Sequence, residues 1–308
     1  MHGIVIKSTG SWYQVKTHNE EVIPCRIKGK FRMKGIKATN PIAVGDQVEM
    51  ELDQDGVGTI HKIQPRKNYI IRKSTNLSKQ VHIIASNIDQ LVLVTSIVQP
   101  RIALGFVDRI LATAEAYSIS ATIVFNKLDI YDESALDRLA EVLAIYHPIG
   151  YDYCLTSVKT GRGMEAFRQL LAGKTSLLSG HSGVGKSSLI NTIEPSLDLK
   201  VKDVSGSNEK GQHTTTFAEL HNLSIGGSII DTPGVRSFGI IDFDREHLSH
   251  YFPEMRELLG HCKFHNCAHI NEPKCAVKDA VEEGEISGSR YQNYVAMYHD
   301  ENLEKTYP

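Results

Sequence analysis

The sequence of 308 residues is short of several features that define special classes of protein. It has five cysteines and one tryptophan, and no stretch approaches the roughly 18 consecutive apolar residues of a membrane-spanning helix. Five cysteines are too few for a disulfide scaffold in a chain of this size. The first residues include a lysine and alternating polar side chains where a signal peptide needs an apolar block. We therefore expect a cytoplasmic protein that makes no contact with membranes.

The composition is that of an ordinary globular protein, with 41% apolar and 23% charged residues. These fractions exclude collagen-like, low-complexity and wholly disordered chains, and the length predicts two or three domains. The net charge of −2 conceals an asymmetry. The first 80 residues hold 14 Lys and Arg against 7 Asp and Glu, whereas the remainder has a net charge of −9. A basic N-terminal part indicates a polyanionic partner.

Short β-branched and alternating stretches dominate the first 65 residues, which indicates an all-β domain over 1–65. The strands are expected at 3–8, 12–17, 21–27, 46–52 and 58–63. Turn signals separate these stretches, and five short strands in this space predict a small closed barrel of the OB type.

One loop of this barrel is unusually basic. Six cations with no acid among them occupy twelve residues: Arg26, Lys28, Lys30, Arg32, Lys34 and Lys37. A solvated charged hairpin would explain them, but on a barrel type that often binds nucleic acid we favour contact with phosphates.

Beyond a basic linker at 64–79, strands alternate with helices. Strands are expected at 90–96, 120–125, 151–156, 174–179, near 217–224 and at 227–231, and helices at 105–117, 134–146, 163–171 and 185–193. This alternation predicts an α/β domain over 66–240 with a mostly parallel sheet. Residues 241–308 read as a mostly helical domain rich in His, Cys and acids.

A phosphate-binding loop follows the apolar strand at 174–179. Residues 180–187 fit G-x-x-x-x-G-K-[ST] and open an apolar helix, which is the context this motif needs. Backbone N–H groups of such a loop surround phosphate oxygens, Lys186 would reach the β- and γ-phosphates, and Ser187 would ligate Mg²⁺. The residues expected around the nucleotide here are Gly180, His181, Ser182, Gly183, Val184, Gly185, Lys186, Ser187 and Ser188.

Two further loops indicate which base is bound. Asn126, Lys127, Leu128 and Asp129 form an N-K-x-D motif at the end of a strand. The Asp129 carboxylate can accept hydrogen bonds from N1–H and the exocyclic amine of guanine, and adenine offers neither donor. Alone, this tetrapeptide could be a helix-capping loop. Thr156, Ser157 and Val158 begin a second candidate base-contacting loop after the next strand.

The remaining motifs are expected to contact the γ-phosphate and its Mg²⁺. Asp231 and Gly234 fit D-x-x-G, in which the Asp is linked to Mg²⁺ and the Gly senses the γ-phosphate. Thr214 and Thr215 lie in a Thr-rich stretch typical of the mobile loop that brings a Thr to Mg²⁺, and we assign that role to Thr215. Together the motifs predict a GTP hydrolase. Their order is permuted, because N-K-x-D precedes the phosphate loop, so the domain is expected to be circularly permuted.

Catalysis needs a group that orients the attacking water. Many GTPases have a Gln directly after D-x-x-G, but here the position is Val235, which cannot exchange a proton. The nearest candidate is His213, beside the Thr run, and the alternative is that His213 only packs or caps its loop. The expected catalytic set is His213, Lys186, Thr214, Thr215, Asp231 and Gly234.

A cysteine cluster indicates a metal in the C-terminal domain. Cys262-x4-Cys267-x-His269-x5-Cys275 offers three thiolates and an imidazole, as in closed Cys₃His zinc sites. The spacing is not that of a standard zinc finger, and His261 and His265 compete with His269 for the fourth position. We expect one structural Zn²⁺.

A permuted GTPase between an OB-like barrel and this Cys/His domain resembles the ribosome small-subunit-dependent GTPase A family, RsgA, also called YjeQ or YloQ. The resemblance covers essentially the whole chain, although the linker departs from the Arg-Pro pattern common in similar proteins at Arg72-Lys73. It implies a bacterial factor in late maturation of the 30S subunit. Its partners would be that subunit, its 16S rRNA and other assembly factors, and it would act as a monomer. The subunit would stimulate GTP hydrolysis, and the nucleotide state would control release from rRNA.

The sequence alone leaves two alternative functions open. One is a permuted GTPase that acts on the large subunit, although the barrel and the zinc domain argue against it. The other is an RNA-binding zinc protein in which the nucleotide gates binding with little turnover, although Lys186, Ser187 and Asp231 favour hydrolysis.

Overall fold

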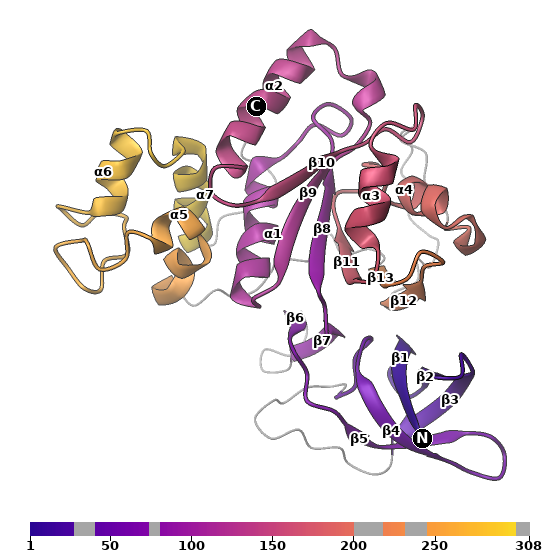
Figure 1. The fold of residues 1–308 in the computed structure, drawn as a ribbon. Coiled ribbons are helices and arrows are strands. Elements are labelled where there is room, and N and C mark those ends of the chain that lie inside the picture. Colours follow the sequence, from indigo (N-terminus) through magenta and orange to yellow (C-terminus); the bar gives the residue numbers. More distant parts are fainter. Residues whose placement is uncertain (28–40, 74–80, 200–217, 232–244, 300–308) are drawn as a thin grey trace, which may run out of the picture.

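The computed structural model describes residues 1–27, 41–73, 81–199, 218–231 and 245–299. Figure 1 shows an N-terminal barrel below a central sheet, which has helices on both faces, and a small helical group at the side of α1. Among these residues, no helix is long and apolar enough to cross a membrane.

Five strands close into the N-terminal barrel. They are β1 (His2–Ser8), β2 (Tyr13–Thr17), β3 (Val22–Ile27), β4 (Gln47–Leu52) and β5 (Gly58–Ile63). The pairing runs β1-β2-β3-β5-β4 and returns from β4 to β1, and within this barrel only β3 and β5 are parallel. Alternate residues such as Val5, Tyr13 and Val15 point inward and are buried. The predicted barrel is confirmed. Arg26 is described, but the rest of its basic loop (28–40) lies outside the described residues.

A two-stranded hairpin lies between the barrel and the central sheet. It pairs β6 (Tyr69–Lys73) with β7 (Val81–Ser86), so the expectation of a plain linker over 64–79 is wrong for β6. The hairpin is fixed to the barrel by Asp46, whose fully buried carboxylate accepts bonds of 2.6 Å from Arg66 Nε, Arg66 Nη2 and Ser86 Oγ. Such a cluster of long-range partners has no local sequence signal.

The central sheet carries the predicted strand–helix alternation. Its strands are β8 (Gln90–Thr95), β9 (Ser120–Phe125), β10 (Asp152–Leu155), β11 (Thr175–Ser179), β12 (Glu219–Asn222) and β13 (Ser228–Asp231). They lie in the order β10-β9-β8-β11-β13-β12, and every pairing except β12–β13 is parallel. Every residue of β8 is buried, as expected for a strand covered on both faces.

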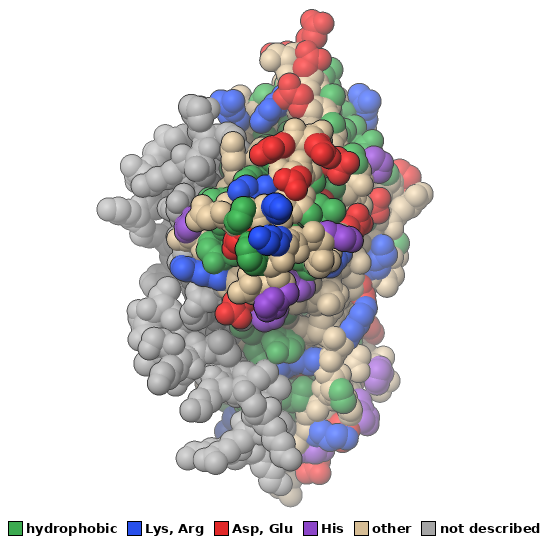
Figure 2. Space-filling model, turned by 90° about the vertical axis from the view of Figure 1, so that its left-hand side faces the viewer, with side chains coloured by type: hydrophobic (Ala, Val, Ile, Leu, Met, Phe, Trp, Pro, Cys, Tyr) green, Lys and Arg blue, Asp and Glu red, His purple; other side chains and the backbone are tan. Residues whose placement is uncertain are grey.

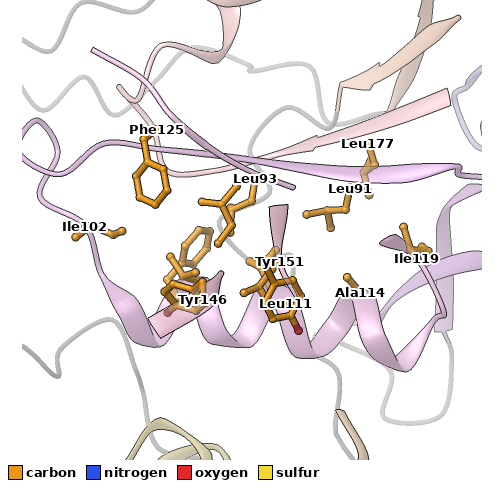
Figure 3. Packing of buried hydrophobic residues seen from close by; sticks show 14 of the residues in the cluster. Leu91, Leu93, Ile102, Leu111, Ala114, Ile119, Phe125, Tyr146, Tyr151 and Leu177 are labelled. Atoms are coloured by element: carbon orange, nitrogen blue, oxygen red, sulfur yellow. The ribbon is translucent and has the colours of Figure 1, made fainter. Parts of the chain in front are cut away.

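Helices cover the two faces of this sheet. One core packs α1 (Leu104–Ala116) and α2 (Glu133–Tyr146) on side chains such as Leu91, Leu93 and Phe125, and Figure 3 shows these residues between the sheet and α1. The other core packs α3 (Met164–Leu171) and α4 (Lys186–Ile193) on the opposite set, including Val92 and Val94. The short 3₁₀ helices η1 (Leu128–Ile130) and η2 (Pro195–Leu197) lie in loops.

The central sheet continues into the barrel through β12. The contact is a single antiparallel pair, Lys7 with Glu219, whose side chains also form an ion pair of 3.0 Å. The barrel and the central strands therefore form one sheet of eleven strands, which is joined where β12 pairs with β1.

The C-terminal helical group contains η3 (Arg245–Tyr251), α5 (Pro253–Arg256), α6 (Ala276–Glu282) and α7 (Gly288–Tyr298). Its core includes Leu248, Phe252, Met255 and Tyr294, and it takes in Ala112 from α1. The predicted helical character of this region is confirmed for the described residues.

Candidate functional site

The loop between β11 and α4 has the backbone that a phosphate-binding loop needs. Gly180, Gly183 and Gly185 have φ angles of +142°, +85° and +95°, which disfavour side chains. A Cβ at Gly180 would collide with the carbonyl of Val94, and one at Gly185 would collide with the side-chain amide of Asn126. The glycines therefore allow the loop to lie directly against the ends of the neighbouring strands.

Lys186 begins α4 and turns its amine back into this loop. Its Nζ donates to the carbonyl oxygens of Gly180 at 2.6 Å and His181 at 2.8 Å. Burial lowers the pKa of Lys186 to about 8, although Asp231 opposes the shift. The amine is thus a half-buried cation near the end of β13, and an anionic group in the loop would stabilise its charge.

The other expected phosphate-loop residues lie in the same loop and in the first turn of α4. The His181 ring packs on Phe106 of α1 with centroids 4.0 Å apart, and Val184 is buried. Ser182 and Gly183 lie at the turn, and Ser187 and Ser188 occupy the first turn of α4. Asp231 is the last residue of β13, the strand beside β11.

Asn126 connects three of the predicted loops. This residue is 2% exposed, and its Nδ2 donates to the carbonyl of Val184 at 2.9 Å. Its Oδ1 accepts from Thr156 Oγ1 at 3.1 Å, and its backbone N–H donates to Thr95 at the end of β8. The N-K-x-D motif, the phosphate loop and the T-S-x-K loop therefore meet at one edge of the sheet.

Asp129 is held by the T-S-x-K loop. Ser157 Oγ donates to its carboxylate at 2.6 Å, and the same hydroxyl accepts from the backbone N–H of Thr160. The backbone N–H of Leu128 donates to the carbonyl of Thr156 at 3.1 Å, Lys127 has a left-handed φ of +66°, and Val158 packs on the α3 side. The carboxylate is thereby given a defined orientation.

The γ-phosphate segments lie largely outside the described residues. His213, Thr214 and Thr215 fall in 200–217, and Gly234 falls in 232–244. Among the predicted residues of this group, Asp231 and Lys186 are described.

A second cluster lies in the C-terminal group. Single ligand atoms of Cys262, Cys267, His269 and Cys275 all lie within 4.8 Å of one another. His269 Nδ1 is 3.5 Å from Cys262 Sγ and 3.3 Å from Cys275 Sγ. Three sulfurs and one imidazole nitrogen at this spacing fit a tetrahedral zinc site. The competing His261 and His265 are exposed and do not belong to the cluster.

Hydrogen bonds hold the loop that carries these ligands. The Glu272 carboxylate accepts from the backbone N–H groups of Ala268, Ile270 and Asn271. From α7, the hydroxyls of Tyr291 and Tyr294 donate to the carbonyls of His269 and Ala268 at 2.8 and 2.7 Å. Burial raises the pKa of Cys267 to about 12 and lowers that of His269. A bound cation would reverse the effect on the thiols by favouring thiolates.

The face around this cluster is polar. In Figure 2 the C-terminal group faces the viewer, and Lys, Arg and His side chains gather near the middle of the molecule below a group of acidic ones. Lys263 and His265, both exposed, come from the cluster loop itself.

Sequence patterns did not reveal the contact between the central and C-terminal parts. Arg290 of α7 is 1% exposed and donates to Asp108 of α1 at 2.8 Å and to Glu254 at 2.7 Å. Asn293 and Tyr146 donate to the same Asp108 carboxylate. One sequence signal could have indicated this contact. Asp108 is a charged residue between the apolar positions Val107 and Ile110 of α1.

Comparison with known proteins agrees with this geometry. Residues 63–241 match the family described as RsgA GTPase, and residues 2–60 match the RsgA N-terminal domain. The chain is 52% identical over 304 residues to the small ribosomal subunit biogenesis GTPase RsgA of Christiangramia forsetii, covering 98% of this chain and 96% of the relative. It is 53% identical over 310 residues to that of Flavobacterium psychrophilum, covering 100% and 94%.

Solved structures show the same arrangement. YjeQ from Thermotoga maritima superposes with a TM-score of 0.78 at 37% identity and covers 99% of each chain. YloQ, described as a circularly permuted GTPase, superposes with a TM-score of 0.73 at 34% identity over 100% of this chain and 96% of that one. With its closed barrel, its permuted nucleotide-site motifs and its Cys₃His cluster, this chain belongs to the RsgA family of circularly permuted small ribosomal subunit biogenesis GTPases.

Proposed function

We propose that this chain binds GTP at the edge of the sheet where the three loops meet. The backbone of 180–185 surrounds the phosphates, Lys186 contacts the β- and γ-phosphates, and Ser187 and Asp231 hold Mg²⁺ together with Thr215. The observation that carries this proposal is the hydrogen-bonded connection of Asn126 to both Val184 and Thr156, because it joins a phosphate loop to a base loop.

Asp129 selects guanine in this scheme. Its carboxylate accepts from N1–H and the exocyclic amine of guanine, and ATP would leave it unsatisfied. Asp129→Asn is expected to weaken GTP binding by about 1–3 kcal/mol and to admit xanthine nucleotides. Equal binding of GTP and ATP by the unmodified protein would contradict this role.

His213 orients the attacking water once a partner orders its loop. Val235 has no polar group, so hydrolysis by the isolated protein is expected to be slow. Lys186 would balance charge that develops on the phosphates, and Mg²⁺, held by Ser187, Asp231 and Thr215, would supply further positive charge there. Gly234 and Thr214 belong to the segments expected to respond to the γ-phosphate. Zn²⁺ at Cys262, Cys267, His269 and Cys275 organises the C-terminal domain.

The partner is the small ribosomal subunit and its 16S rRNA. The relatives are named as biogenesis GTPases of that subunit, and the basic N-terminal part of this chain suits a polyanion. The nucleotide state would control binding and release, because in the sequence the γ-phosphate segments precede β12 and follow β13, and β12 pairs with β1 of the barrel.

The test is GTP hydrolysis with purified 30S subunits, with 50S subunits and with neither. We expect the 30S subunit to stimulate turnover and the 50S subunit to leave it slow. In His213→Ala the stimulated rate should fall at least about tenfold, with GTP and 30S binding retained. Stimulation by the 50S subunit alone would overturn the choice of subunit, and full turnover in His213→Ala would assign the water to another group.

A further inference from the structure

The Tyr131 hydroxyl lies where the N-K-x-D loop leaves the sheet. It donates to the backbone carbonyl of Asn126 at 3.0 Å and accepts from the backbone N–H of Ile97 at 2.8 Å. The Oγ of Ser96 is 3.5 Å away. One side chain thus joins the end of β9 to the segment that follows β8.

The same residue closes the loop through its backbone. Its N–H donates to the carbonyl of Leu128 and ends the 3₁₀ turn η1, while its hydroxyl returns to Asn126 at the start of the loop. The segment between these two bonds contains Lys127, with its left-handed φ of +66°, and Asp129. Fixing both ends of so short a loop leaves its carboxylate few orientations.

We propose that Tyr131 is a positioning residue for base recognition, which it serves by clamping the loop that carries Asp129. The inference rests on the proposed role of Asp129 toward guanine. Tyr131 acts through the backbone of Asn126, because its hydroxyl is bonded to the Asn126 carbonyl and to the Ile97 N–H. Its ring packs against the hydrophobic core and contributes to stability, whereas its hydroxyl makes the hydrogen bonds that clamp the loop.

Loss of the clamp has a distinctive consequence. Two hydrogen bonds to guanine require the carboxylate to lie in the plane of the base, whereas one bond tolerates a rotated carboxylate. Inosine triphosphate lacks the exocyclic amine and keeps one of the two bonds. A loosened loop should therefore cost GTP more affinity than ITP, which a general loss of stability would not do.

The experiment measures GTP and ITP dissociation constants for Tyr131→Phe, which removes the hydroxyl and keeps the ring. We expect GTP affinity to fall about fivefold or more and the preference for GTP over ITP to shrink at least about threefold. The matched control is Tyr151→Phe. Tyr151 belongs to the same hydrophobic core, and the hydroxyl that this substitution removes lies 3.4 Å from Glu115. The substitution should leave the preference unchanged.

Asp129→Asn separates this inference from the function on which it rests. If Asp129→Asn loses the preference while Tyr131→Phe keeps that of the unmodified protein, the clamp is refuted and guanine recognition stands. If Asp129→Asn keeps the preference, the proposed base site itself fails, and the clamp fails with it.

A second measurement uses the unmodified protein and does not depend on a variant that folds. Amide hydrogen exchange at Ile97 is followed with and without GDP. Because the Ile97 N–H donates to the clamp, its protection should rise several-fold when GDP binds. Unchanged protection at saturating GDP would overturn the proposal.

Discussion

The pKa of Lys186 depends on whether an anion occupies the loop around it. Its half-buried amine donates to two carbonyls of its own loop, and desolvation lowers its pKa to about 8. Phosphates bring negative charge and favour the protonated amine, so nucleotide binding should raise this pKa again.

Proton uptake is therefore expected on GTP binding at pH 8. A group with a pKa of about 8 is half protonated there and becomes fully protonated when bound, which corresponds to about half a proton taken up per nucleotide. At pH 6.5 the amine is already charged, and its contribution should vanish. Calorimetric titration in buffers of different ionisation enthalpy measures the uptake. If Lys186→Met still takes up half a proton on GTP binding at pH 8, the proton belongs to another group.

At the residue scale, sequence motifs of fixed spacing pointed to residues that the structure brings together. The phosphate loop, N-K-x-D and T-S-x-K are local patterns, and the structure brings their residues together at one edge. The partners that hold them are not local. Asp108 meets Arg290 from 182 residues away, and Tyr131 acts through a backbone carbonyl, for which no residue type is required.

At the scale of elements, the loop of residues 262–275 carries four side chains that could hold a metal ion. Cys262 and Cys267 are half-buried, and the hydrogen bonds from Tyr291 and Tyr294 reach only the part around His269. A loop of this kind gains its folding energy from the metal.

Cys267→Ala should therefore remove the metal and unfold this loop. Metal analysis is expected to find about one zinc per chain in the unmodified protein and almost none in the variant. Nucleotide binding should persist, because the phosphate loop lies in the central domain. Cys154→Ala, at a half-buried cysteine of β10, is the matched control and should keep its zinc. A full zinc content in Cys267→Ala would exclude this ligand set.

Most elements were predictable because their apolar periods are clear. The five barrel strands and the alternating elements of the central domain begin and end within about two residues of their expected bounds. The hairpin β6–β7 was missed, since basic residues at 66–73 look like a linker and their pairing partner lies beyond residue 80. Asp46 of the barrel binds Arg66 and Ser86 and so joins the hairpin to the barrel, and no periodicity reveals this contact.

At the scale of the whole molecule, two ion pairs join the central domain to the C-terminal group in different ways. Arg290 is fully enclosed between Asp108 and Glu254, and burial raises the pKa of Asp108 even though Arg290 opposes it. Arg256 pairs with Glu115 at 2.8 Å but is half exposed.

Arg290→Ala should accordingly destabilise the protein by about 3–5 kcal/mol, because it leaves two buried carboxylates without their cation. Arg256→Ala, the matched control across the same interface, should cost less than about 1 kcal/mol. Urea unfolding followed by circular dichroism measures both. Equal effects of the two substitutions would mean that the buried network contributes no more than the surface pair.

The barrel's basic residues should govern how 30S binding depends on salt. Replacing Lys28, Lys30, Arg32 and Lys34 with Ala is expected to flatten the log–log slope of affinity against salt by up to about one unit for each phosphate that is no longer neutralised. Arg138→Ala with Arg168→Ala, two exposed cations of the central domain, is the control and should leave the slope unchanged. An unchanged slope in the fourfold variant would make the loop a solvated surface.

The permuted strand order also bears on how the chain is synthesised. Within the central sheet, β8, β9 and β10 are translated first and pair side by side, β11 then adds to the free edge of β8, and the β12–β13 pair adds to β11. The strands β8 to β11 each join a free edge, whereas β13 lies between β11 and β12, both of which precede it in the chain. The base and phosphate loops are complete once α4 has emerged, whereas Asp108 waits for Arg290, 182 residues later in the chain, to neutralise it. A nascent chain can thus assemble its nucleotide pocket before the domain that completes it exists.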